Sequence, residues 1–118
     1  MAYTIRERTF SFGLKIVAIV NKLPENRMGK VLGNQLLRAG TSIGANVEEA
    51  DAAFSRNSFS YRISVAAAEA RETSYWLRLL RESNVSTPIV LDPLIQEAQE
   101  LQKILGSINR KTRPNANS

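Results

Sequence analysis

The residues best suited to catalysis or metal binding are polar side chains at helical spacing in two segments of the chain. Ser42, Asn46 and Glu49 are four and three positions apart, which places them on one strip of a helix. A later segment carries two carboxylates, Glu69 and Glu72. Carboxylates that face one another across helices hold the metal ions of di-iron helical bundles. These five residues therefore raise the question of a metal site.

The chain contains no histidine and no cysteine, which excludes most metal and hydrolytic chemistry. The di-iron bundles need a Glu-x-x-His motif from each of two helices, so that site cannot be built. Zinc sites, serine and cysteine triads and the usual general bases also rely on imidazole or thiolate groups. An all-carboxylate Mg²⁺ or Mn²⁺ site remains open, but we expect no metal, no cofactor and no catalytic residue. The sequence predicts a protein that is not an enzyme.

The polar strip then has two interpretations. Its groups form a hydrogen-bonded layer between helices, with Arg38 or Arg71 paired to the carboxylates, or they face water. Small residues neighbour the strip, and a partly buried position favours pairing because buried polar groups almost always find a hydrogen-bond partner. We therefore expect the paired arrangement.

The stretch LLRAGTSIGANVEEA, residues 36–50, places glycines inside a helical pattern. Each glycine costs about 1 kcal/mol relative to alanine there, so a packing contact must offset the loss. Gly40 and Gly44 share a face and would let a neighbouring backbone come close. The segment AAAEA, residues 66–70, offers a matching surface. We predict a tight seam between the second and third helices or between subunits, formed by Arg38, Gly40, Ser42, Gly44, Asn46, Glu49, Glu69, Glu72 and Trp76.

The charge balance suggests a polyanionic partner. Sixteen Lys and Arg residues against eleven Asp and Glu give a net charge of +5, and a basic surface attracts nucleic acid. In an up-down bundle the basic residues gather at one end, where acidic residues reduce their effect. The alternative is a solvated helix end with a loose tail. The predicted nucleic-acid-binding residues are Arg6, Arg8, Arg56, Arg62, Arg110, Lys111 and Arg113.

Four segments carry apolar residues three or four positions apart, which is typical of amphipathic helices. No strand-like alternation competes with them, and the connections are short. We predict an all-α, antiparallel up-down-up-down four-helix bundle, with one domain over residues 1–118. The predicted helices span about 9–23, 27–54, 56–83 and 88–109, followed by a basic tail over 110–118.

Several residues mark the expected helix ends. Thr9 and Ser55 are suitable N-caps for the first and third helices. The second apolar stripe runs from Met28 to Phe54. The fourth helix has two possible starts, because Thr87-Pro88 and Asp92-Pro93 are both good pairs of cap and first helical residue.

The composition also bears on the compartment. No apolar run approaches the roughly 20 residues that a membrane-spanning helix needs, so we expect no membrane association. The segment MAYTIRERTF at the start lacks the apolar core of a signal peptide. Together with the lack of cysteine, this fits a cytoplasmic protein.

Two motifs, QLLRAGTSIGANVEEADAAFSR (35–56) and EARETSYWLRLL (69–80), resemble the four-helix-bundle proteins of the 23S rRNA-intervening-sequence family. Members are encoded within insertions in bacterial ribosomal RNA genes and as free-standing genes. The resemblance covers roughly residues 9–110 and includes TFSFGLKIV (9–17). Family members usually carry an acidic residue where this chain has Ser58, so the capping box is missing and Ser55 must cap alone.

This resemblance implies a homopentameric ring. A relative, the accessory protein of diversity-generating retroelements, forms a basic ring that binds a reverse transcriptase and nucleic acid. The resemblance thus implies a non-enzymatic oligomeric scaffold, RNA-associated, that binds RNA or DNA through basic surfaces. The alternative is a scaffold for a protein partner, such as a reverse transcriptase, with no direct contact to nucleic acid.

Overall fold

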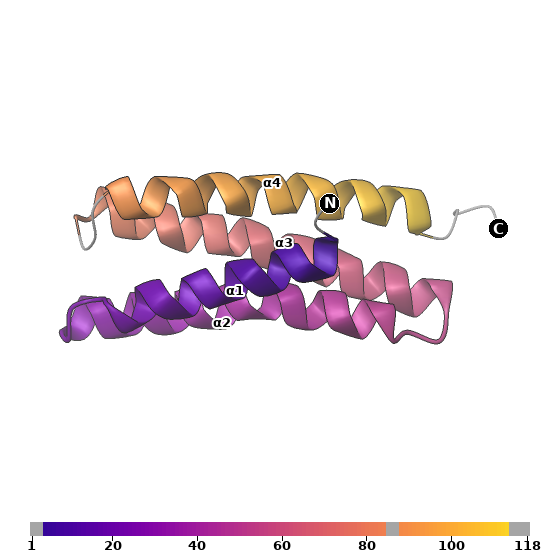
Figure 1. The fold of residues 1–118 in the computed structure, drawn as a ribbon, viewed down its shortest axis with the longest axis horizontal. Coiled ribbons are helices and arrows are strands. Elements are labelled where there is room, and N and C mark those ends of the chain that lie inside the picture. Colours follow the sequence, from indigo (N-terminus) through magenta and orange to yellow (C-terminus); the bar gives the residue numbers. More distant parts are fainter. Residues whose placement is uncertain (1–3, 85–87, 114–118) are drawn as a thin grey trace.

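The structure is a bundle of four α-helices that lie side by side (Figure 1). They are α1 (Ile5–Asn21), α2 (Arg27–Asp51), α3 (Arg56–Glu82) and α4 (Pro88–Thr112). The structure, a computed structural model, describes residues 4–84 and 88–113 and contains no strand within these ranges. The all-α prediction is confirmed. No helix in this part of the chain is long and apolar enough to cross a membrane.

The helix ends differ from the predicted ones at α1. Thr4, not Thr9, is the N-cap, and its hydroxyl accepts a hydrogen bond of 3.0 Å from the backbone N–H of Glu7. Thr9 is buried within the helix and donates to the carbonyl of Arg6. The helix begins earlier because Ile5 extends the apolar stripe and packs against the core. Ser55 caps α3 as predicted.

At the other boundaries, α4 begins at Pro88, which leaves Pro93 inside the helix. The same helix continues to Thr112, past the predicted end at 109, and the last part of the predicted tail, residues 114–118, lies outside the described residues. Phe54 is fully exposed because α2 already ends at Asp51.

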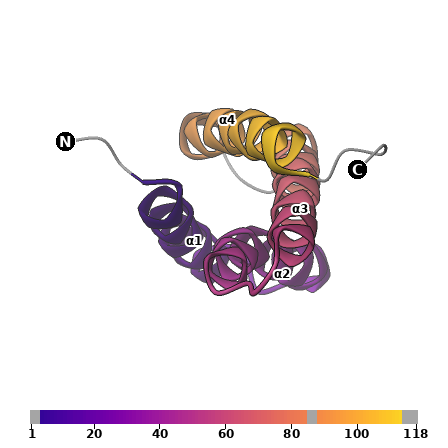
Figure 2. The ribbon, with the colours of Figure 1, turned by 90° about the vertical axis from the view of Figure 1, so that its right-hand side faces the viewer.

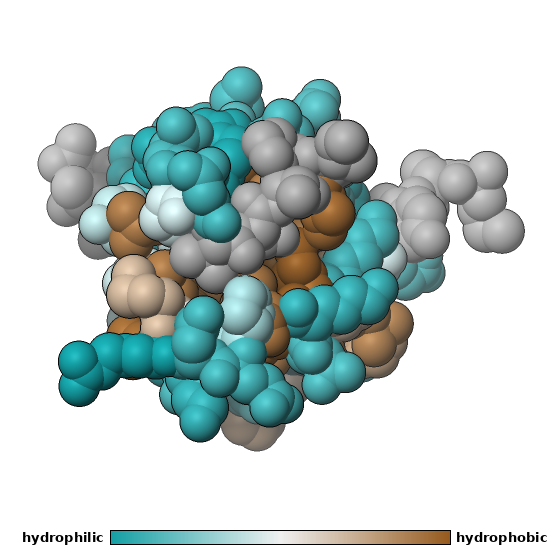
Figure 3. Space-filling model, turned by 90° about the vertical axis from the view of Figure 1, so that its left-hand side faces the viewer, coloured by the Kyte–Doolittle hydropathy of each residue, from teal (hydrophilic) through white to brown (hydrophobic). Residues whose placement is uncertain are grey.

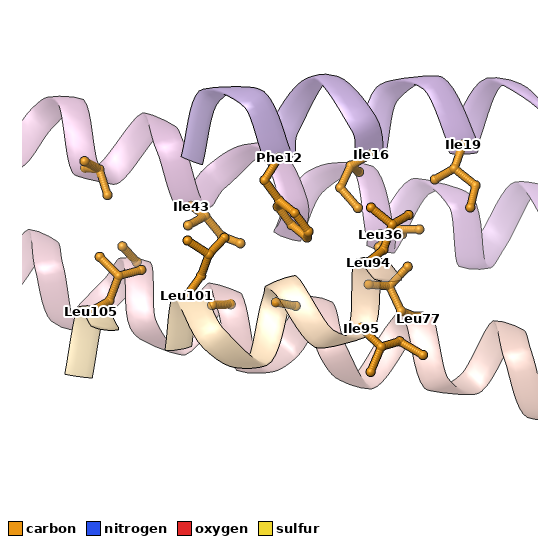
Figure 4. Packing of buried hydrophobic residues seen from close by; sticks show 14 of the residues in the cluster. Phe12, Ile16, Ile19, Leu36, Ile43, Leu77, Leu94, Ile95, Leu101 and Leu105 are labelled. Atoms are coloured by element: carbon orange, nitrogen blue, oxygen red, sulfur yellow. The ribbon is translucent and has the colours of Figure 1, made fainter. Parts of the chain in front are cut away.

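The core is a single cluster of apolar side chains to which all four helices contribute. Figure 4 shows them converging on the bundle axis, with Phe12 of α1 near Leu36 and Ile43 of α2 and Leu101 of α4. Burying a side chain of this size stabilises the fold by about 1.5–3 kcal/mol relative to leaving it exposed. The hydrophobic effect thus determines which face of each helix is buried in the core and which face is exposed and available for binding.

The small-residue seam lies between α1 and α2, which corrects the prediction that it joins the second and third helices. A Cβ atom added to Gly40 would lie 2.8 Å from Cγ2 of Ile16. One added to Gly44 would lie 3.3 Å from the carbonyl oxygen of Thr9. The absence of a side chain at both glycines therefore lets α1 of the same chain pack closely against α2. Gly40 and Gly44 do not supply a close contact to α3. The face of α2 toward α3 carries the polar strip instead.

The bundle is least closed between its first and last helices. Helices that follow one another in the chain pack closely, whereas α1 and α4 have few contacts. Figure 2 shows α1 and α4 on either side of a gap, with α2 and α3 on the opposite side of the bundle. At the end where α1 meets α2, apolar side chains reach the surface between hydrophilic ones (Figure 3). The predicted basic residues belong to the opposite end.

Candidate nucleic-acid interface

The basic end of the bundle is assembled by hydrogen bonds between the start of α3 and the end of α4. Nε of Arg56 donates to the carbonyl oxygen of Thr112 at 2.7 Å. One turn further, Nδ2 of Asn109 donates to the carbonyl oxygen of Ser60 at 2.8 Å. An arginine at this position is favourable because the last carbonyls of a helix lack partners and carry partial negative charge. These bonds hold Arg56 beside the cations that end α4, which are Arg110, Lys111 and Arg113.

Arg62 extends this group toward α2. Its Nη1 donates to Oδ1 of Asn46 at 3.4 Å, and its Cζ atom lies 5.9 Å from the centre of the Tyr61 ring. Both Arg62 and Tyr61 are exposed. Neither contact neutralises the guanidinium charge, so Arg62 can still attract an anion.

Two of the predicted basic residues are neutralised by carboxylates. Arg6 pairs with Glu48 at 3.0 Å and lies 3.9 Å from Asp51. Arg8 binds Glu97 through two hydrogen bonds of 2.7 Å, and these bonds raise the pKa of the Arg8 guanidinium. The start of α1 is also set back from the end of the bundle (Figure 1). The predicted nucleic-acid-binding residues therefore fall into two groups. The two arginines on α1 form ion pairs with carboxylates, and the others form a basic cluster without such pairs among the described residues.

We use the name basic cluster for the five exposed cations that remain. Within the described residues, no carboxylate oxygen lies within 4.0 Å of their charged groups. Its members are Arg56, Arg62, Arg110, Lys111 and Arg113.

A basic groove between α3 and α4 was not predicted from the sequence. It has a volume of about 450 Å³, and none of the residues that line it is acidic. Arg71 and Lys103 are exposed on its rim, and Arg110 connects it with the basic cluster. Helical spacing predicts for Arg71 only a pairing with carboxylates, because the rotation of α4 relative to α3 is a property of the packed bundle. The lining residues are Ala67, Arg71, Gln99, Gln102, Lys103, Gly106 and Arg110.

Part of the polar strip forms the predicted hydrogen-bonded layer, with Arg38 and not Arg71 as its cation, whereas Glu49 faces water as in the alternative interpretation. Arg38 contacts Glu72 at 2.6 Å and lies 3.9 Å from Glu69. The indole Nε1 of Trp76 donates to the same Glu72 carboxylate at 3.1 Å. These contacts join the middle of α2 to α3.

The remaining members of the strip make mainly local contacts, apart from the bond that Asn46 accepts from Arg62 of α3. Ser42 donates to the carbonyl of Arg38, and Asn46 donates to the carbonyl of Ser42. Glu49 is exposed. No group of three or more potential metal ligands occurs in the part of the chain that the structure describes. The strip thus joins helices and caps backbone carbonyls.

Glu69 is the most unusual carboxylate of the layer. Its Oε2 atom is buried and has no hydrogen-bond partner among the described residues. Burial raises the pKa of this carboxyl group, and the nearby charge of Glu72 raises it further, while Arg38 acts in the opposite direction. Desolvation disfavours the charged form of an acid, which explains the direction.

Among the described residues, exposed apolar side chains include one group on α1 and one on α3. On α1, the side chains of Phe10, Leu14 and Val17 are exposed and line a hollow of about 260 Å³ against α2. On α3, Tyr75 and Leu79 are four positions apart and exposed. We call these the α1 apolar surface and the α3 apolar surface. Exposed patches of this kind are typical of protein contacts.

Comparisons with known proteins agree with the four-helix fold. A family model described as 23S rRNA-intervening sequence protein matches residues 2–107. A crystal structure from Bacteroides thetaiotaomicron, described as a protein of unknown function from the S23 ribosomal protein family, is 34% identical. The alignment covers 91% of this chain and 99% of that one, with a TM-score of 0.85. No match was found among curated proteins.

Proposed function

The chain belongs to the 23S rRNA-intervening sequence protein family, and we propose that it is a non-enzymatic, RNA-associated scaffold that binds polyanions. The observation that carries this proposal is the basic cluster, whose cations have no carboxylate partner in the described part of the chain. Lys and Arg side chains bind phosphates and release the counterions condensed on nucleic acid. Such contacts fix position without reading sequence. The expected ligand is therefore RNA or DNA bound through its backbone.

An antiparallel up-down-up-down arrangement is part of the proposal, because it brings the basic residues together. Arg81, at the end of α3, pairs with Asp92, near the start of α4, at 3.0 Å. Arg56, at the start of α3, bonds to Thr112, at the end of α4. These two contacts support opposite directions for α3 and α4.

A homopentameric ring is the assembly that we propose, on the basis of the family resemblance and the two apolar surfaces. The α1 and α3 apolar surfaces differ in composition and lie on different helices. Contact between unlike surfaces of successive copies is heterologous, and such contacts close into rings when the rotation allows it. A ring would repeat the basic cluster in each subunit and add up phosphate contacts.

The test is fluorescence anisotropy with a labelled 20-nucleotide RNA and a DNA of the same sequence over a salt series. We expect binding to both at about 50 mM salt and a linear fall of log K with log salt concentration. The Lys111→Gln/Arg113→Gln variant should lower the steepness of that fall. Lack of binding at about 50 mM salt would overturn the polyanion proposal.

A protein-interaction scaffold is the second candidate, and the α1 apolar surface favours it. Phe10 is 61% exposed and Leu14 is 58% exposed, and in this second function the α1 apolar surface holds a protein partner in place of a neighbouring subunit. A partner such as a reverse transcriptase would then be held without contact to nucleic acid. A protein that binds no nucleic acid at about 50 mM salt, where electrostatic binding is strong, would favour this function.

A further inference from the structure

We propose that the basic groove between α3 and α4 binds the sugar-phosphate backbone of a single-stranded nucleic acid. This inference rests on the proposed function and assigns the ligand a path along the molecule. The path begins at Arg71, passes Lys103 and reaches the basic cluster at Arg110.

The charges of the groove fit phosphate groups. Its three cations are accompanied by two side-chain amides and by no acidic residue. Within residues 4–84 and 88–113, neither Arg71 nor Lys103 has a carboxylate oxygen within 4.0 Å, whereas Arg38 and Arg81 are both in ion pairs. Cations that are exposed and lack an internal partner are the ones available to an anionic ligand.

Small residues give the groove its depth. Ala67 of α3 and Gly106 of α4 line it between the long side chains. A Cβ atom added to Gly106 would lie 3.4 Å from Nη1 of Arg110, so the guanidinium extends over the glycine. The hollow between the helices therefore admits a chain of small cross-section beside the donor groups that line it.

The dimensions favour one strand over a duplex. Gln99 and Arg110 are eleven positions apart in α4, which corresponds to about 16 Å of helix. That length accommodates a few successive phosphates of one strand, and a hollow of about 450 Å³ is too small to receive a double helix. Gln99 and Gln102 add amide groups that can donate to phosphate oxygens or bond with a ribose hydroxyl.

The groove has no aromatic lining residue, so bases have no platform on which to stack. Binding should therefore depend on salt far more than on base sequence. None of the residues of the α1 and α3 apolar surfaces lines the groove.

The experiment measures anisotropy of a labelled 20-nucleotide oligouridine and of an RNA duplex of equal length, each over a salt series. The groove variant is Arg71→Gln/Lys103→Gln. We expect its slope of log K against log salt to be less steep by about 1.4 for the single strand, since each lost phosphate contact accounts for about 0.7. The matched control is Arg27→Gln/Lys30→Gln, which removes the same charge from exposed cations at the start of α2. Its slope should equal that of the unmodified protein.

A second pair of variants tests the groove without removing its cations. Gly106→Glu places a carboxylate beside Arg110, and Gly106→Gln adds a side chain of the same size without charge. We expect Gly106→Glu to weaken oligouridine binding by about tenfold relative to Gly106→Gln, as for loss of a charged hydrogen bond. Circular dichroism and thermal melting of every variant confirm the fold.

The outcomes distinguish failure of the groove assignment from failure of the proposed polyanion-binding function. If the unmodified protein binds neither probe at about 50 mM salt, the proposed function fails and the groove inference fails with it. If it binds and the groove variant keeps its slope, or loses no more than the control, only the groove assignment is overturned. Tighter binding of the duplex with the same dependence on Arg71 and Lys103 would overturn the assignment to a single strand.

Discussion

Arg8 of α1 and Glu97 of α4 are joined by two hydrogen bonds of 2.7 Å, Nε to Oε2 and Nη2 to Oε1. Nη2 also lies 3.3 Å from Glu100. This bidentate pair bridges α1 and α4, which have far fewer contacts than the three pairs of helices that follow one another in the chain. Arginine and carboxylate groups in this geometry interact more strongly than single hydrogen bonds between neutral groups. The side of the bundle that is least closed by apolar packing is thus held by charge.

Replacement of Glu97 should destabilise the fold through this bridge. We expect Glu97→Gln to reduce the free energy of unfolding by about 1 kcal/mol, since the pair is partly exposed and screened by solvent. The melting temperature should fall by about 4 °C. The control is Glu100→Gln, which removes a longer and more exposed contact with Arg8 and should have a smaller effect. Equal losses for the two variants would show that bidentate geometry contributes nothing.

The buried carboxyl group of Glu69 should make stability depend on pH. Its pKa is raised in the folded protein above the ordinary value of 4.5, so the folded state binds the proton more tightly than the unfolded state. The stabilising contribution is therefore fully present below the unfolded pKa and is lost as the pH rises through the folded pKa. In Glu69→Gln this contribution is absent at every pH.

Urea denaturation from pH 4 to pH 7 measures this effect. The difference in free energy of unfolding, Glu69→Gln minus the unmodified protein, should increase as the pH rises above about 4.5. The matched control is Glu49→Gln, which changes an exposed carboxylate on α2 and should leave the difference constant. A difference for Glu69→Gln that stays flat, or falls with rising pH, would contradict the assigned direction.

The seam between α1 and α2 can be tested with two glycine-to-alanine substitutions. Gly40→Ala would place a Cβ 2.8 Å from Cγ2 of the buried Ile16, so α1 must shift. We expect a loss of about 1–3 kcal/mol in the free energy of unfolding. Gly13→Ala is the matched control, because nothing lies within 4 Å of an added Cβ there. It should stabilise the protein by up to about 1 kcal/mol through helix propensity. A Gly40→Ala protein as stable as Gly13→Ala would contradict the seam.

The sequence was sufficient to predict four helices, because apolar residues three or four apart reflect local helical geometry. It also predicted a paired layer between the second and third helices, because small residues adjoin the strip, but it left open whether Arg38 or Arg71 supplies the cation. The sequence did not reveal which helix packs against the glycine face of α2. Gly40 and Gly44 show only that some backbone comes close, and the identity of that backbone depends on the packing of the whole bundle.

The functional surfaces were also predictable only in part, because the sequence does not give the rotation of each helix about its axis. The basic cluster was predictable because Arg56 and Arg110 lie near helix ends that an up-down arrangement brings together. Pairing of Arg8 with Glu97, which are 89 positions apart, depends on the rotation of both helices about their axes. The groove depends on the same rotation, because Arg71 and Lys103 line one hollow only when α3 and α4 present those faces to each other.

The proposed ring predicts a specific result when two damaged subunits are mixed. Leu14 lies on the α1 apolar surface and Leu79 on the α3 apolar surface, and both are exposed. A charge buried in an apolar contact is strongly unfavourable, so Leu14→Glu and Leu79→Glu should each abolish assembly and leave monomers. In a heterologous interface the undamaged surface of one variant still fits the undamaged surface of the other. An equimolar mixture should therefore form dimers with one interface and no larger species.

Light scattering coupled to size-exclusion chromatography measures the mass of each sample. The matched control is Val90→Glu, which adds the same charge at an exposed position of α4 outside both surfaces and should leave the ring intact. Monomers in the mixture would contradict contact between these two unlike surfaces. Dimers of Leu14→Glu alone would indicate that the α3 apolar surface binds its own copy, in which case the interface is isologous and closes at two subunits instead of a ring.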